Sequence, residues 1–113
     1  MTWRAQSGLR SWLWQRLSAL YIGAFIVFFV ISMIMAPLND YALWYAWFAN
    51  PLNNIASGLF VIALGIHAWV GIRDVIFDYV HPMSARFILL IGLALSLMAM
   101  TLWGLRILFY VKL

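Results

Sequence analysis

Long uncharged runs dominate the chain and determine the predicted fold. The first run covers residues 17–39, the second lies between residues 40 and 73, and the third covers 87–105. Each can supply the roughly 20 apolar residues that a helix needs to cross about 30 Å of hydrocarbon. None alternates strictly between apolar and polar residues, so helices are favoured over the strands of a membrane barrel. The pattern therefore predicts an all-α integral membrane protein with three transmembrane helices.

Proline and capping residues mark where these helices begin and end. Pro37 ends the first helix, and Pro51 is typical of the first turn of the second. The "HPMS" stretch separates the second helix from the third, with Ser84 as the expected N-cap. The connections are too short for a further domain. The predicted helices are 16–37, 53–79 and 84–110, within one membrane domain that covers residues 1–113.

The segment that precedes the first helix, residues 1–15, mixes Trp with Arg. This mixture is typical of a short helix that lies in the membrane interface. A basic start followed by an apolar run also occurs in signal peptides. Here the apolar run is too long for one, and no A-x-A-like cleavage site follows it. We therefore expect the first run to be a membrane span.

The composition excludes an ordinary soluble domain. Apolar residues make up 67% of the chain, against seven Arg or Lys and three acidic residues, all Asp. So few charges cannot cover a water-facing surface. The net charge of +4 does not indicate nucleic acid, because the basic residues stand singly near the ends of apolar runs. The absence of cysteine excludes a thiolate-held iron–sulfur cluster and covalent haem attachment within this chain.

The basic residues also predict the orientation in the membrane. They gather in the N-terminal tail and between the second and third helices, whereas the first connection carries only Asp40. By the positive-inside rule, the N-terminus is cytoplasmic and the C-terminus, with Lys112, is outside. Arg106 is on the wrong side and is expected to reach the headgroups with its long side chain. The residues that favour this orientation are Arg4, Arg10, Arg16, Arg73 and Arg86.

His67 is the chemically distinctive residue of the second predicted helix. It lies near the middle of the membrane, where an imidazole without partners is costly. One interpretation is a hydrogen bond between helices, with nearby glycines serving only packing. The other is an axial ligand of haem iron, with glycines that let a flat group approach the backbone. The glycines in question are Gly58, Gly65 and Gly71.

A count of ligands predicts a partner subunit. A low-spin haem needs two axial ligands, and this chain has one histidine at membrane depth. His81 is expected at the water interface, out of reach of the same iron. Met98 and Met100 are alternative ligands, although methionine is common as packing material. The simplest source of the second ligand is another chain.

Asp78 and Tyr79 end the second predicted helix at its cytoplasmic side. Asp78 lies eleven residues after His67, nearly on the same helix face and about 16 Å along the axis. The pair fits an ordinary interfacial belt. It also fits a quinone site, because a phenol can donate to a quinone carbonyl and a carboxylate can relay protons from water. Arg73 and Asp74 are expected to form a surface ion pair.

The stretch "HAWVGIRDVIFDYVHP", residues 67–82, resembles the second helix of the D-type membrane anchor subunit of bacterial succinate dehydrogenase (complex II). The shared pattern is H-A-W-x-G followed by D-Y-x-x-P. Helix layout, length and an Arg at the start of the first helix extend the resemblance over nearly the whole chain. It implies that His67 is an axial ligand of haem b, that Tyr79 hydrogen-bonds ubiquinone with Asp78 beside it, and that Arg16 lies near the haem propionates.

The resemblance also implies the partners and the location. A C-type cytochrome b anchor subunit would supply the opposite histidine and share the quinone site. Flavin (FAD) and iron–sulfur clusters would belong to a flavoprotein subunit and an iron–sulfur subunit, so this chain alone would catalyse nothing. The expected location is the bacterial inner membrane, as a multi-pass subunit, and a trimer of heterotetramers is compatible with it. Some relatives have His-Asp where this chain has Arg10-Ser11, so no role is carried over to those two residues.

Other classes of protein fit less well or stay open. A fumarate reductase anchor has a similar size, but many lack haem, and His67 argues against that variant. A small multidrug exporter normally needs a membrane-buried carboxylate, whereas all three Asp are expected near interfaces. Another small b-type cytochrome or quinone-binding subunit remains an alternative. A purely structural subunit would tolerate His67→Leu without loss of redox activity.

Overall fold

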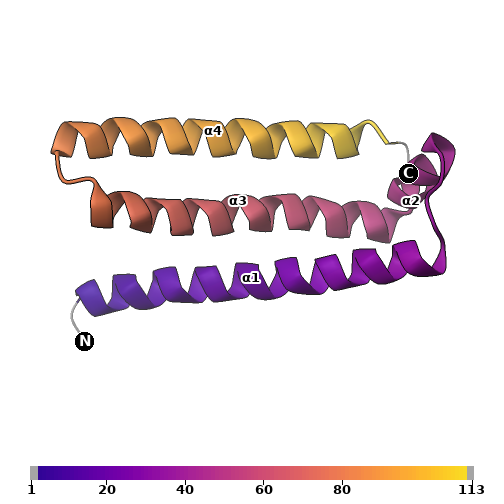
Figure 1. Ribbon diagram of the computed structural model, residues 1–113, viewed down its shortest axis with the longest axis horizontal. Coiled ribbons are helices and arrows are strands. Elements are labelled where there is room, and N and C mark those ends of the chain that lie inside the picture. The colour runs from indigo at the N-terminus through magenta and orange to yellow at the C-terminus, as the bar shows by residue number, and fades with distance from the viewer. Residues whose placement is uncertain (1–2, 112–113) are drawn as a thin grey trace.

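The chain is all-helical over the part that the computed structural model describes, residues 3–111, with side chains described from residue 8 onward. The side chain of Arg4 and the whole of Lys112, both used above for orientation, lie outside it. The described helices are α1 (Trp3–Met35), α2 (Tyr41–Ala49), α3 (Pro51–Tyr79) and α4 (Met83–Phe109) (Figure 1).

Three of these helices are long and apolar enough to cross a membrane: Gly8–Met35 within α1, Pro51–Tyr79 and Met83–Phe109. The predicted fold class, all-α with three such helices, is therefore confirmed. The predicted range 53–79 differs from α3 by two residues at its start, and 84–110 is shifted by one residue from α4.

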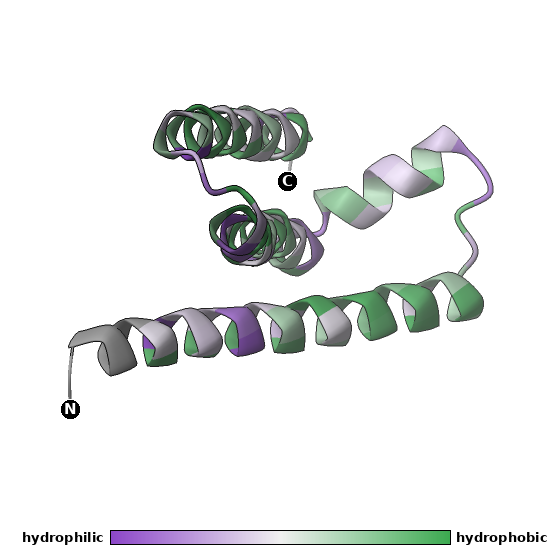
Figure 2. Ribbon diagram, turned by 60° about the vertical axis from the view of Figure 1, so that its left-hand side comes forward, coloured by the Kyte–Doolittle hydropathy of each residue, from purple (hydrophilic) through white to green (hydrophobic). Residues whose placement is uncertain are grey.

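Helix α3 is the centre of the molecule. It packs against α1 on one side and α4 on the other, and α2 also contacts it. Figure 1 shows the start of α1 and the α3–α4 connection at one end, with α2 and the end of α4 at the other. In Figure 2, α1 is seen along its length while α3 and α4 are foreshortened, so α1 is inclined to both.

Two expectations about element boundaries were wrong. The start of α1 is at Trp3 rather than at residue 16, so residues 3–15 continue into the span instead of forming a separate short helix. No proline interrupts this region, and the single Gly8 is tolerated within a helix. The second correction is α2, which lies in a stretch that we expected to be a connection. Its N-cap Asp40 accepts a hydrogen bond from the Leu43 amide at 2.9 Å.

The structure shows the expected type of cap at the start of α3 but not at the start of α4. Pro51 occupies the first turn of this helix, as expected, and the side chain of Asn50 caps it by accepting a hydrogen bond from the Leu52 amide at 3.0 Å. The helix begins two residues before the predicted start at residue 53. Ser84 is not an N-cap: α4 begins one residue earlier, after Pro82, and that cap has no side-chain hydrogen bond. Pro82 already fixes the extended backbone that precedes the helix.

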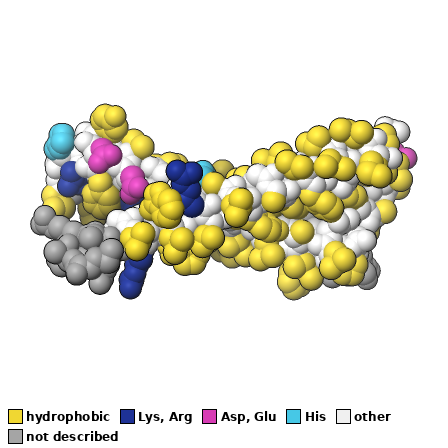
Figure 3. All heavy atoms as spheres, turned by 90° about the horizontal axis from the view of Figure 1, so that it is seen from below, with side chains coloured by type: hydrophobic (Ala, Val, Ile, Leu, Met, Phe, Trp, Pro, Cys, Tyr) yellow, Lys and Arg dark blue, Asp and Glu magenta, His cyan; other side chains and the backbone are white. Residues whose placement is uncertain are grey.

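The described part of the chain has almost no interior of its own. Large apolar side chains are exposed along every helix, and none is fully enclosed. Figure 3 shows hydrophobic side chains over most of one face, with most of the charged side chains gathered toward one end. A soluble monomer rarely exposes so much contiguous apolar surface, whereas lipid and partner helices cover it readily. The few buried residues are Ser18, Ser57, Ala63, Val70 and Ile76.

Candidate functional site

His67 lies on the face of α3 that meets α1. Its ring is half-buried, and its Nδ1 is 3.2 Å from the hydroxyl oxygen of Ser18 on α1. The same hydroxyl lies 3.0 Å from the backbone carbonyl of Gln15, to which it donates. The Nε2 of His67 makes no hydrogen bond to any described residue. It is also not among the enclosed polar atoms that lack a partner. The ring therefore has one nitrogen engaged between helices and one nitrogen accessible.

Two glycines near His67 lie close to neighbouring helices. A Cβ on Gly65 would lie 2.9 Å from the Thr101 hydroxyl of α4, so this glycine is needed for the close approach of α3 and α4. A Cβ on Gly71 would lie 3.5 Å from the side-chain amide of Gln15 on α1. The Gly65 contact favours the packing interpretation for that glycine, whereas the Gly71 contact is an ordinary van der Waals contact and favours neither interpretation. Both contacts leave the role of His67 open.

Gln15 of α1 contacts both Ser18 and Gly71. Its backbone carbonyl accepts a hydrogen bond from the Ser18 hydroxyl, and its side chain lies beside Gly71, one turn beyond His67. Its Oε1 is the buried side-chain polar atom without a hydrogen-bond partner in the described part of the chain. Polar groups buried at membrane depth are normally satisfied. His67, Ser18 and Gln15 therefore form a polar cluster, here called the α1–α3 seam, in an otherwise apolar interface.

Asp78 and Tyr79 lie at the C-terminal end of α3. Tyr79 is the last helical residue and is 78% exposed, and Asp78 is exposed as well. Neither side chain makes a hydrogen bond or ion pair to any described residue. Because the two residues are consecutive in a helix, their side chains differ by about 100° around its axis. Both functional groups are therefore free to meet a molecule or a chain from outside.

Arg86 of α4 closes the same end of α3, a contact that the sequence analysis missed. Its guanidinium donates to the carbonyl oxygen of Phe77 at 2.7 Å and to that of Val80, and it lies 5.6 Å from the centroid of the Phe77 ring. These carbonyls belong to the last turn of α3, which has no further helical amides to pair with. The cation thus fixes the turn that carries Asp78 and Tyr79.

Arg16 is exposed and makes no hydrogen bond to His67. Its guanidinium lies 5.6 Å from the centroid of the Trp12 ring on the exposed side of α1. Ser18, which touches His67, is two residues further on, or about 200° around the helix. The predicted contact of Arg16 with haem propionates stays a prediction, and the seam itself brings together His67, Ser18 and Gln15 instead.

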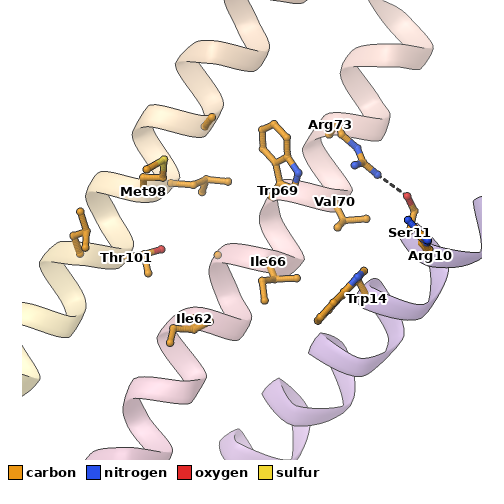
Figure 4. Close-up of a pocket in the computed structure, with 14 residues that line it drawn as sticks. Arg10, Ser11, Trp14, Ile62, Ile66, Trp69, Val70, Arg73, Met98 and Thr101 are labelled. Atoms are coloured by element: carbon orange, nitrogen blue, oxygen red, sulfur yellow. Dashed lines mark hydrogen bonds between the residues drawn. The ribbon is translucent and has the colours of Figure 1, made fainter. Parts of the chain in front are cut away.

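A groove of about 830 Å³ lies beside α3, between α1 and α4. Arg73 donates to the Ser11 hydroxyl at one end of it, with an Nη2–Oγ distance of 2.6 Å (Figure 4). The same Nη2 is 3.4 Å from the carboxylate of Asp74, so the expected surface ion pair is confirmed. Arg10 also lines this end, and the rest of the lining is largely apolar; His67 does not line the groove. Besides the residues at this end, the groove is lined by Trp69 of α3 and by Met98 and Thr101 of α4.

The layout of three long apolar helices, with most of the charged side chains toward one end, is that of a small multi-pass membrane protein. Residues 1–105 match the family of succinate dehydrogenase/fumarate reductase transmembrane subunits, and the chain belongs to that family. It is similar to the succinate dehydrogenase hydrophobic membrane anchor subunit of Coxiella burnetii (strain RSA 493 / Nine Mile phase I), with 26% identity over 108 residues. That match covers 96% of this chain and 94% of the relative.

Proposed function

We propose that this chain is the D-type anchor subunit of a bacterial succinate:ubiquinone oxidoreductase in the inner membrane. A C-type anchor subunit would complete its haem b and ubiquinone sites. An iron–sulfur subunit and a flavoprotein subunit, which holds FAD, would dock on its cytoplasmic side. The family includes fumarate reductase subunits, and the similarity to the Coxiella burnetii succinate dehydrogenase anchor subunit favours the succinate dehydrogenase branch. The observation that carries the proposal is the environment of His67, which lies near the middle of a helix long and apolar enough to cross a membrane and has a hydrogen-bond partner at Nδ1 but none at Nε2 among the described residues.

The residues around His67 fit a haem better than a bare metal ion. In the described part of the chain, no three His, Asp, Glu or Cys side chains come together to hold a metal. A porphyrin provides nitrogen ligands of its own, so a haem would need only one imidazole from this chain. Bound there, the group would supply one-electron redox chemistry. His67 would hold it from one side, and a histidine of the C-type subunit would hold it from the other.

The end of α3 suits reduction of a quinone at the membrane surface. Tyr79 lies twelve residues beyond His67, about 18 Å along the helix axis. Its hydroxyl is available to donate a hydrogen bond to a quinone carbonyl, and the Asp78 carboxylate beside it can pass on protons from water. Electrons from the soluble subunits and protons from the cytoplasm would meet at this level. The haem would lie deeper in the membrane.

The haem assignment is tested by His67→Ala in the assembled complex, with His81→Ala as the matched control. We expect His67→Ala to lose the low-spin haem b spectrum, because a missing axial ligand leaves the iron five-coordinate or unbound. His81 is exposed beyond the end of α3, so its variant should keep the wild-type spectrum. The measurement is a reduced-minus-oxidised optical spectrum, scaled to the flavin content. An unchanged low-spin spectrum in assembled His67→Ala would show that His67 is not a ligand.

A further inference from the structure

We infer that Ser18 is a positioning residue for His67. Its hydroxyl accepts the Nδ1–H of the imidazole and so presents the unprotonated Nε2 to the haem iron. The inference deepens the proposed function and rests on it, because it presumes that His67 is a ligand. It adds a residue of α1 to a site that the sequence pattern assigned to α3 alone.

The direction of the hydrogen bond follows from a count of protons. A serine hydroxyl has one hydrogen, and that of Ser18 is directed to the Gln15 carbonyl at 3.0 Å. The Ser18 oxygen can then only accept from the His67 Nδ1, which is 3.2 Å away. Nδ1 must therefore carry a proton. A neutral imidazole has only one N–H, so the lone pair that binds a metal is left on Nε2.

The surroundings make this arrangement hard to exchange for another. Ser18 is 6% exposed, so no bulk water can replace the imidazole as its partner. The donor and the acceptor belong to different helices, so the bond fixes the ring relative to α1 as well as to α3. The Gln15 side chain lies beside Gly71, one turn away. If the ring flipped, a polar nitrogen would lose its partner at membrane depth, which is costly.

A partner on the second nitrogen is what a metal-binding histidine generally uses for its orientation. Such a partner sets the tautomer, holds the ring plane and raises the basicity of the ligating nitrogen. A more basic imidazole favours ferric over ferrous iron and so lowers the reduction potential of the haem. Loss of the Ser18 hydroxyl should therefore raise that potential and loosen the haem, with an affinity loss on the order of 10- to 100-fold.

The test compares three variants in the purified complex by haem-to-flavin ratio, low-spin spectrum and reduction potential. Ser18→Ala removes the acceptor, and Ser18→Thr restores a hydroxyl. Ser57→Ala is the matched control, because Ser57 is equally buried but donates to the Asn53 carbonyl of its own helix at 2.7 Å. We expect Ser18→Ala to bind less haem at a raised potential, and Ser18→Thr and Ser57→Ala to resemble wild type. Wild-type haem content and potential in Ser18→Ala would overturn the inference.

A further comparison separates this inference from the proposed function. If His67→Ala loses the haem while Ser18→Ala behaves as wild type, the ligand stands and the positioning role fails. If both variants keep the low-spin haem, the proposed role of His67 as a haem ligand itself fails. Ser18→Cys covers a failure of Ser18→Ala to assemble, because its thiol nearly keeps the side-chain volume but accepts hydrogen bonds weakly. Its potential should rise as well, and an unchanged potential would again overturn the inference.

Discussion

At the scale of single residues, removing the hydroxyl of Tyr79 is the most direct test of the proposed quinone site. Tyr79→Phe keeps the ring and removes one exposed group that touches nothing in the described chain. If that group donates to a quinone carbonyl, its loss should cost about 1–3 kcal/mol, or roughly ten- to hundredfold in quinone reduction. Succinate oxidation with an artificial acceptor, which bypasses the membrane site, should stay near normal, as should the haem spectrum.

Tyr41→Phe provides the matched control for this measurement. Tyr41 is also exposed, at 79%, but it begins α2 at the other end of the molecule. Its variant should show wild-type rates in both assays. An equal loss in the quinone and bypass assays of Tyr79→Phe would indicate damaged assembly, and wild-type quinone kinetics would remove Tyr79 from the site.

The sequence identified His67 as a candidate site residue, but it did not identify its neighbour Ser18. A histidine inside a long apolar run stands out by itself, because its polar ring must find a partner at that depth. Serine does not stand out in the same way, since it can donate to a carbonyl of its own helix at any position, as Ser32 does to Phe28 at 2.8 Å. Which serine meets the histidine depends on how α1 is rotated and inclined against α3. That information is in the packing and not in the pattern of one run.

At the scale of elements, the cap that Arg86 forms on α3 makes a prediction of its own. Arg86→Ala should unpair the carbonyls of Phe77 and Val80 and weaken the last turn by about 1 kcal/mol, because one charged cap is worth about that much at a partly solvated helix end. Amide exchange at Val80, whose N–H donates to Ile76, should then be about fivefold faster. Hydrogen–deuterium exchange of the complex measures this.

Arg106→Ala is a suitable control, because its guanidinium pairs with the hydroxyl of Tyr110 and not with a helix carbonyl. Exchange at Val80 should be unchanged in it. Arg86→Lys should fall between wild type and Arg86→Ala, since an ammonium cannot reproduce the fork of a guanidinium. Unchanged exchange at the end of α3 in Arg86→Ala would contradict the cap.

The elements themselves were predictable where long runs and proline defined them, and less so elsewhere. Length and hydropathy identified α3 and α4 to within two residues, because proline stops or starts each of them. The short α2 was not predicted because its residues are nearly all apolar, with no polar face to give a helical period. The early start of α1 was not predicted because Trp and Arg are typical of a membrane interface in either a separate or a continuous helix.

At the scale of the whole molecule, the exposed surface makes the chain depend on its surroundings. Helix α3 packs against α1, α4 and α2. Large apolar side chains of α3, such as Leu59 and Val75, nevertheless remain exposed. Lipid can cover apolar side chains, but it cannot satisfy the accessible nitrogen of His67. An outside helix with a polar side chain at the same depth can do so. The exposed surface is therefore compatible with our proposal that a second anchor subunit completes the site.

The last prediction concerns how this molecule is oriented in the membrane. Helix α2 has nine residues and is about 14 Å long, too short to cross the bilayer, so we predict three spans and termini on opposite sides of the membrane. The start of α1 and the α3–α4 connection share one end, which carries Arg10, Arg73 and Arg86 (Figure 1). By the positive-inside rule that end faces the cytoplasm. Reporters fused after residues 39 and 113 should be active in the periplasm, and one fused after residue 83 should be cytoplasmic. A cytoplasmic reporter at residue 113 would contradict both the orientation and the placement of the quinone site on the side where the soluble subunits dock.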